Sequence, residues 1–153
     1  MTNSTLQKQL IQAGAAFGGL AVIAGAFGSH GLKDVLEPVN MDIFETAVRY
    51  QFYHAFALLI IGFGMRRVKE NVAKITFASF IIGIILFCGS LYLLSTSRLW
   101  AGTKLRWFGA VAPVGGVSFV IGWAYLCFRG YKPSTHSHSA QQIQEMHKRK
   151  TDV

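Results

Sequence analysis

Charged residues divide this chain into long apolar blocks. Four stretches contain no Asp, Glu, Lys or Arg, and they run over residues 9–32, 50–65, 75–97 and 107–128. A transmembrane helix needs about 20 predominantly apolar residues, with a range of about 17–25. Three stretches reach this length, and the second reaches it if Ala47 and Val48 are included and Arg49 extends to the interface. The pattern predicts transmembrane helices at about residues 10–31, 47–65, 75–96 and 107–128.

Two other interpretations of these stretches are weaker. In a soluble all-α bundle the helices keep a polar face, whereas the stretch from Ile75 to Leu94 has almost no polar residues. A cleaved signal peptide has an apolar region of about 7–15 residues, and the first stretch is longer. We therefore expect an all-α, integral membrane four-helix bundle over residues 1–128 and a polar cytoplasmic tail over residues 129–153.

Composition and charge agree with a membrane location. Only 14% of the residues are charged, against about 25% in a soluble domain. Ten of the 15 Lys and Arg residues lie in the N-terminus, the second loop and the tail, and five lie in the other two loops. The positive-inside rule then places both termini of a multi-pass membrane protein in the cytoplasm. Because the basic residues flank apolar spans, the expected partner is the lipid bilayer and not nucleic acid.

The first loop is the acidic segment of the chain. Pro38 interrupts it, and we expect a short interfacial helix that leads into the second span. Asp42 is a candidate N-cap for that helix. Glu45 and Arg49 are four residues apart and can pair on one helix face.

Small residues recur along the spans and predict close helix packing. Gly14 and Gly18 form a G-x-x-x-G pair in the first span, and Gly25 continues the row. In the fourth span, we expect Pro113 and the Gly115-Gly116 pair to break the regularity of the helix. Whether these rows face a helix of the same chain or of another is left open by the sequence, with packing inside the chain as the default.

Polar residues within the spans are the best lead to function, because they are costly in lipid and face the bundle interior. The predicted topology gathers one group of them in a single outer-leaflet layer: His30, Tyr50, Gln51, His54 and Ser90. Such a layer suits three roles: a hydrogen-bond network between helices, a small-ligand or cofactor site, or catalysis. Three further histidines lie in the tail, where no spacing fixes a metal geometry: His136, His138 and His147. We expect no metal site, and Cys88 and Cys127 are expected to be packing residues.

Four segments together resemble a known family: Gly25–Leu32 (GAFGSHGL), Thr46–Ala55 (TAVRYQFYHA), Gly89–Leu94 (GSLYLL) and Ala112–Phe119 (APVGGVSF), followed by Gly122-Trp123. In this order they are similar to the bacterial domain of unknown function 423 family, which is related to transmembrane protein 256. The resemblance covers about residues 10–127. Ser29 stands where the family usually has Ala, and Ala112 where it usually has Thr. The resemblance implies a four-helix inner-membrane protein and supplies no activity.

The leading functional prediction is a non-enzymatic accessory or scaffold membrane protein without a cofactor. Its protein partner, another membrane protein or a second copy of the chain, is left open. The alternative is a small transport or cofactor-binding protein that uses His30 and His54.

Overall fold

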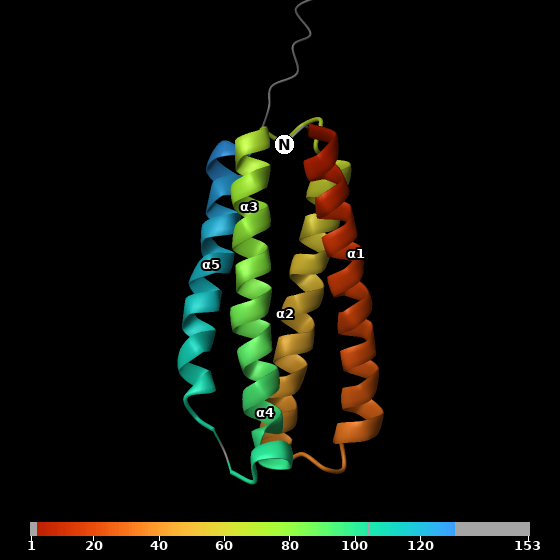
Figure 1. The fold of residues 1–153 in the computed structure, drawn as a ribbon, viewed down its shortest axis with the longest axis vertical. Coiled ribbons are helices and arrows are strands. Elements are labelled where there is room, and N and C mark those ends of the chain that lie inside the picture. Colours follow the sequence, from red (N-terminus) through yellow and green to blue (C-terminus); the bar gives the residue numbers. More distant parts are fainter. Residues whose placement is uncertain (1–2, 104, 131–153) are drawn as a thin grey trace, which may run out of the picture.

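The computed structural model describes residues 3–103 and 105–130, and within them every regular element is a helix. In chain order these are α1 (Asn3–Phe27), the π-helical turn η1 (Gly28–Leu32), α2 (Pro38–Phe63), α3 (Glu70–Gly83), the π-helical turn η2 (Ile84–Cys88), α4 (Gly89–Ala101) and α5 (Phe108–Arg129). Figure 1 shows that α3, η2 and α4 continue one another as a single long rod. The protein is therefore an all-α bundle of four long helices, as the sequence predicts.

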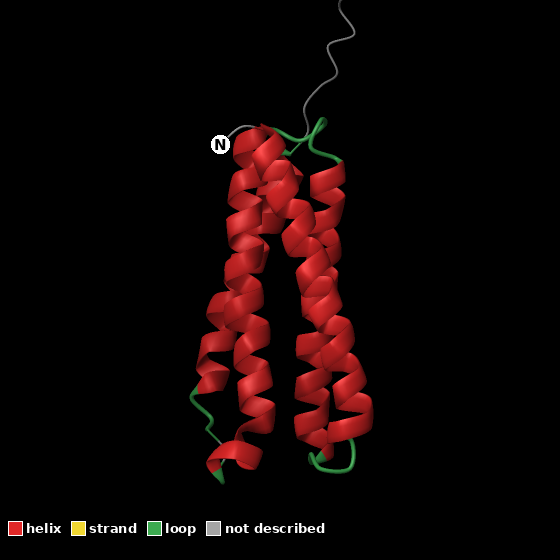
Figure 2. Ribbon diagram, turned by 45° about the vertical axis from the view of Figure 1, so that its right-hand side comes forward, coloured by secondary structure: helices red, strands yellow, loops and turns green. Residues whose placement is uncertain are grey.

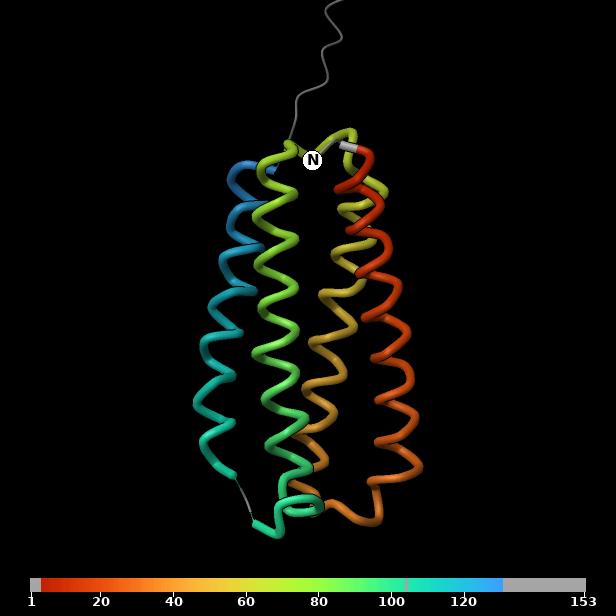
Figure 3. Tube along the Cα trace, in the orientation of Figure 1, coloured from red at the N-terminus to blue at the C-terminus, as the bar shows by residue number. Residues whose placement is uncertain are grey.

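The four helices form two antiparallel pairs, α1 with α2 and the α3–α4 rod with α5 (Figure 2). The start of α1, the loop between α2 and α3, and the end of α5 all lie at one end of the bundle (Figure 3). We call this the basic end, because five cationic residues lie there: Lys8, Arg66, Arg67, Lys69 and Arg129. The loops after η1 and α4 lie at the opposite end.

The surface of the bundle suits a lipid environment. Three of the long helices, counted with their π-helical turns, are long and apolar enough to cross a membrane: Ser4–Leu32, Glu70–Ala101 and Phe108–Arg129. Large apolar side chains cover their outer faces, and Ile60 and Phe63 of α2 are also exposed. α2 has 26 residues and is not among these three. Its first half contains Asp42, Glu45 and Arg49. Gln51 and His54 are buried between the helices, so the second half of α2 exposes mainly apolar residues such as Ile60 and Phe63.

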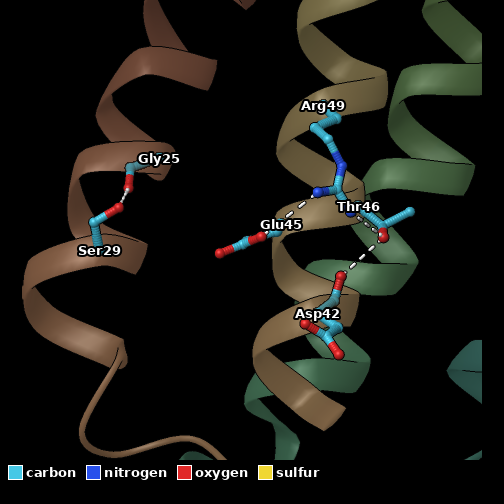
Figure 4. Close-up of polar contacts among 6 residues, drawn as sticks. All are labelled: Gly25, Ser29, Asp42, Glu45, Thr46 and Arg49. Atoms are coloured by element: carbon cyan, nitrogen blue, oxygen red, sulfur yellow. Dashed lines mark hydrogen bonds and ion pairs between the residues drawn. The ribbon is translucent and has the colours of Figure 1, made fainter. Parts of the chain in front are cut away.

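α2 begins earlier than the sequence pattern predicts. The expected interfacial helix and the second span form one helix from Pro38, whose fixed φ suits the first helical turn. Asp42 is therefore not the N-cap, and its backbone carbonyl accepts a hydrogen bond from Thr46 Oγ1 at 2.8 Å. The predicted pair between Glu45 and Arg49 forms at 3.5 Å on the exposed face (Figure 4).

α5 corrects a second expectation, because Pro113 and the two glycines do not interrupt it. The missing N–H of Pro113 removes one backbone bond, while a break inside the bilayer would leave several polar groups without water or a partner. Gly115 has a packing role, since a Cβ atom there would overlap the backbone of Phe87 in η2. Its absence lets α5 approach the middle of the α3–α4 rod.

α1 packs on α2 in the same way. A Cβ atom at Gly14 would lie 2.9 Å from the carbonyl oxygen of Ala55, which is inside ordinary contact distance. Gly18 also faces Ala55, and Gly25 faces Val48 at ordinary contact distances. The small-residue row of α1 thus meets a helix of the same chain.

Candidate functional site

His54 occupies a defined place between α2 and α5, and it is 4% exposed. Its Nδ1 atom lies 2.7 Å from the backbone carbonyl oxygen of Tyr50, and its Nε2 atom lies 3.2 Å from Nε1 of Trp123. A carbonyl oxygen only accepts hydrogen bonds and an indole N–H only donates them. These two partners therefore fit a neutral imidazole with its proton on Nδ1 and its lone pair on Nε2.

Aromatic rings surround the same imidazole. Phe119 of α5 is stacked on it, with ring centroids 3.5 Å apart and planes 12° apart. Phe80 of α3 meets it edge-on at 5.0 Å. His54 thereby joins α2 to both α3 and α5, and dispersion between the rings adds to its hydrogen bonds.

Gln51, one turn before His54, bonds in the same way to α1 and to the α4 part of the α3–α4 rod. Its Nε2 atom donates to the carbonyl oxygen of Phe17 in α1 at 2.9 Å. Its Oε1 atom accepts from the hydroxyl group of Tyr92 in α4 at 3.1 Å. Gln51 and His54 together connect α2 to every other long helix. We call Gln51, His54, Tyr92 and Trp123 the polar hub.

The structure brings together only part of the predicted layer. Gln51 and His54 are buried neighbours, and the half-exposed ring of Tyr50 packs on Phe87 with centroids 4.8 Å apart. Ser90 is buried, but its hydroxyl donates to the carbonyl oxygen of Phe87 in its own rod. It contributes a local bond and no link between helices.

His30 does not join this group. It lies exposed on η1, whereas Gln51 contacts α1 at Phe17, 13 residues earlier in the chain. At about 1.5 Å of rise per residue, this separation corresponds to roughly 20 Å along the axis. The expectation of one layer containing both histidines is therefore wrong in geometry.

Trp123 and Tyr92 are the hub residues that the predicted layer leaves out. Both carry a polar group within a charge-free stretch, where a donor surrounded by hydrocarbon needs an acceptor. That need could have identified Trp123 and Tyr92 from the sequence as residues with a polar partner on another helix. The choice of acceptor depends on how each helix is rotated about its axis, which single-span patterns do not give.

Two apolar grooves flank the polar hub. One, of about 570 Å³, lies between α1 and the α3–α4 rod, and Gln51 and Tyr92 are among its lining residues. The other, also about 570 Å³, lies beside α5, with His54, Trp123 and Pro113 in its lining. Both grooves are mainly hydrocarbon in character.

Metal ligands are not clustered within the described chain. Across residues 3–103 and 105–130, no group of three or more His, Cys, Asp or Glu residues could hold a metal ion. The tail histidines lie outside the described residues. Cys88 is buried in the core, whereas Cys127 is exposed on α5.

A family model described as a protein of unknown function (DUF423) matches residues 24–116, a segment that includes Gln51, His54 and Tyr92. The chain belongs to the DUF423 family. This assignment confirms the resemblance seen in the four sequence segments. The DUF423 protein is thus an integral membrane protein of a family without an established activity.

Curated relatives extend the same finding. A UPF0382 membrane protein of Staphylococcus epidermidis is 43% identical over 119 residues, covering 78% of this chain and 92% of the relative. The UPF0382 membrane protein YwdK of Bacillus subtilis is 35% identical over 127 residues, covering 82% and 98%. A UPF0382 membrane protein of Haemophilus influenzae is 35% identical over 115 residues, covering 75% and 87%. No solved structure matches this DUF423 protein.

Proposed function

We propose that this DUF423 protein is a non-enzymatic accessory or scaffold protein of the bacterial plasma membrane. The observation that supports it most is the state of the polar hub. Both ring nitrogens of His54 and both ends of the Gln51 amide already have partners on the protein. Groups engaged in this way stabilise a bundle, and they are poorly placed to transfer protons or bind a substrate.

The hydroxyl groups of α4 point to the same conclusion. Ser90, Ser95 and Ser97 each donate to the carbonyl oxygen three residues earlier in the rod. Thr76 of α3 donates to the carbonyl oxygen of Gly122 in α5 at 3.3 Å. A nucleophilic hydroxyl needs a general base within hydrogen-bond reach, and these hydroxyl groups bond to carbonyls instead.

A cofactor-binding or transport function based on His30 and His54 receives less support. Ligation of haem or a metal through Nε2 of His54 would require Trp123 to give up its acceptor. His30 is too far along α1 to supply a second ligand at the same centre. The geometry therefore favours the scaffold role.

The proposal includes an orientation. The basic end, with the start of α1 and the end of α5, faces the cytoplasm, because Lys and Arg flanking the spans are retained on that side.

Site-specific photocrosslinking in cells tests the proposed role. A photoreactive amino acid is placed at one exposed position on each of the four rods: Val22, Ile60, Ile85 and Val120. A scaffold protein should give one protein adduct, identified by mass spectrometry, from one or two adjacent rods and lipid adducts from the others. Lipid adducts from all four positions would contradict the proposal. So would purified protein with a stoichiometric coloured cofactor or metal.

A further inference from the structure

A pocket of about 460 Å³ opens at the basic end of the bundle, between the start of α3 and the end of α5. Lys69, Asn71 and Ile75 line it on one side, and Tyr125 and Arg129 line it on the other. Unlike the grooves beside the polar hub, its lining is divided between polar and apolar atoms. Such a lining suits an amphiphile better than a hydrocarbon chain.

Two cationic residues line this pocket: Lys69, which directly precedes α3, and Arg129, the last residue of α5. The backbone N–H of Lys69 donates to the carbonyl oxygen of Gly130 at 3.3 Å, which holds the start of α3 against the end of α5. Lys69 and Arg129 are exposed, and neither forms an ion pair with another described residue. Their joint field favours an anion at the mouth of the pocket.

The carboxylate in the pocket wall does not cancel this field. Glu70 Oε1 lies 2.6 Å from Nζ of Lys74, so its charge is compensated within α3. Lys69 and Arg129 therefore leave an excess of two positive charges around the pocket. Lys69 also forms no side-chain cap, so the first amide groups of α3 add their partial positive charge.

The pocket lies at the boundary between charged loops and apolar spans. The charge-free stretches begin at Ile75 in α3 and end at Phe128 in α5. Ile75 and Tyr125 both line the pocket on its apolar side, and Phe128 beyond them is 83% exposed. Tyrosine is typical of the level at which lipid headgroups meet the hydrocarbon region. The pocket is thus continuous with the lipid-facing surface of α5.

We propose that this pocket binds the headgroup of an anionic phospholipid. Lys69 and Arg129 contact the phosphate, and the glycerol end of the acyl chains lies along Ile75 and Tyr125. The charge complementarity selects an anion, and the apolar wall selects a lipid over a soluble phosphate. This site is independent of the proposed scaffold role and of the polar hub.

Lipid titration of purified, delipidated protein tests the proposal. Phosphatidylglycerol or phosphatidylcholine is added in mixed micelles, and bound lipid is counted by native mass spectrometry. The wild type should retain one phosphatidylglycerol in preference to phosphatidylcholine. K69Q/R129Q should bind phosphatidylglycerol at least about tenfold more weakly, because each cation near a headgroup contributes an attraction of this order. The control K33Q/R106Q removes the same charge at the opposite end and should bind like the wild type.

Three outcomes would overturn the proposal. K69Q/R129Q could keep the full preference, or K33Q/R106Q could lose it equally, which would indicate a general effect of surface charge. Alternatively, inorganic phosphate could displace the lipid and stabilise the protein as well, which would assign the pocket to a soluble anion. If K69Q/R129Q does not fold, R129Q alone should still lose most of the retained phosphatidylglycerol, and undiminished retention would count against the site.

Discussion

The indole N–H of Trp123 in α5 donates to Nε2 of His54 in α2 across 3.2 Å. This bond joins the two helix pairs at a depth where water is not available to replace either partner. Because it also fits one tautomer of the imidazole, the two residues should contribute to stability as a unit.

A double-mutant cycle measures the coupling free energy between His54 and Trp123. His54→Ala should lower the free energy of unfolding by roughly 2–4 kcal/mol, because it leaves the indole donor without its acceptor and opens a cavity against Phe119. Trp123→Phe should cost less. The two should couple by about 0.5–1.5 kcal/mol, the range for hydrogen-bonded partners within membranes. Unfolding in mixed micelles gives these values, and strictly additive losses would show that the bond contributes nothing.

Unlike His54 and Trp123, the two histidines His30 and His54 should contribute independently to the free energy of unfolding. His30→Ala should change the free energy of unfolding by less than about 0.5 kcal/mol, since His30 is exposed on η1. Combined with His54→Ala, its effect should be additive within about 0.3–0.5 kcal/mol, as expected for distant sites. A larger coupling, measured in the same unfolding experiment, would restore the shared layer that the sequence suggested.

Glycine substitutions separate packing contacts from open surface. Gly115→Ala should destabilise the bundle by about 1–3 kcal/mol or more, because the added Cβ would overlap the backbone of Phe87. Gly19→Ala is the matched control on α1, since nothing lies within 4 Å of its Cβ position. It should be neutral or slightly stabilising, because Ala favours helix. Thermal melting in detergent compares the two, and equal melting temperatures would argue against close packing of α5 on η2.

Reporter fusions test the proposed orientation. Green fluorescent protein fused after Val153 should fluoresce, and alkaline phosphatase inserted after Asp34 should be active outside the cytoplasm. The Lys and Arg distribution between the two ends is the reason for this expectation. An active phosphatase fused after Val153 would reverse the orientation of the bundle.

The sequence predicts the long helices of this protein better than the contacts between them. Charge-free stretches identify the four long helices, and the spacing of Glu45 and Arg49 identifies their ion pair. By contrast, membership of one half of the predicted topology does not bring His30 or Ser90 to His54. His30 lies roughly 20 Å along the axis from the level at which Gln51 contacts α1, and the hydroxyl of Ser90 bonds within its own rod. Which side chains meet depends on packing between helices, which the pattern along a single chain does not encode.

The sequence pattern also predicts helix starts and helix interruptions poorly. Asp42 and Pro113 carry strong local signals for a cap and a break, yet each lies within a continuous helix. For Asp42, the helix already begins at Pro38, whose fixed φ suits the first turn. For Pro113, which lies in an apolar span, the cost of unpaired backbone groups in a bilayer outweighs the local preference. The same requirement explains why Thr76 and Gln7 donate to the carbonyl oxygens of glycines on neighbouring helices.

The π-helical turn η2 has a consequence for how this chain tolerates insertions and deletions. A π turn holds one residue more than an α turn, so removing one residue from Ile84–Cys88 would convert η2 to regular α-helix with little rotation of α4 relative to α3. The same removal within the α-helical residues 89–91 would turn Tyr92 by about 100° away from Gln51, although no residue of the hub had been replaced. Spacing therefore constrains the start of α4 as strictly as residue identity, whereas η2 can lose one residue.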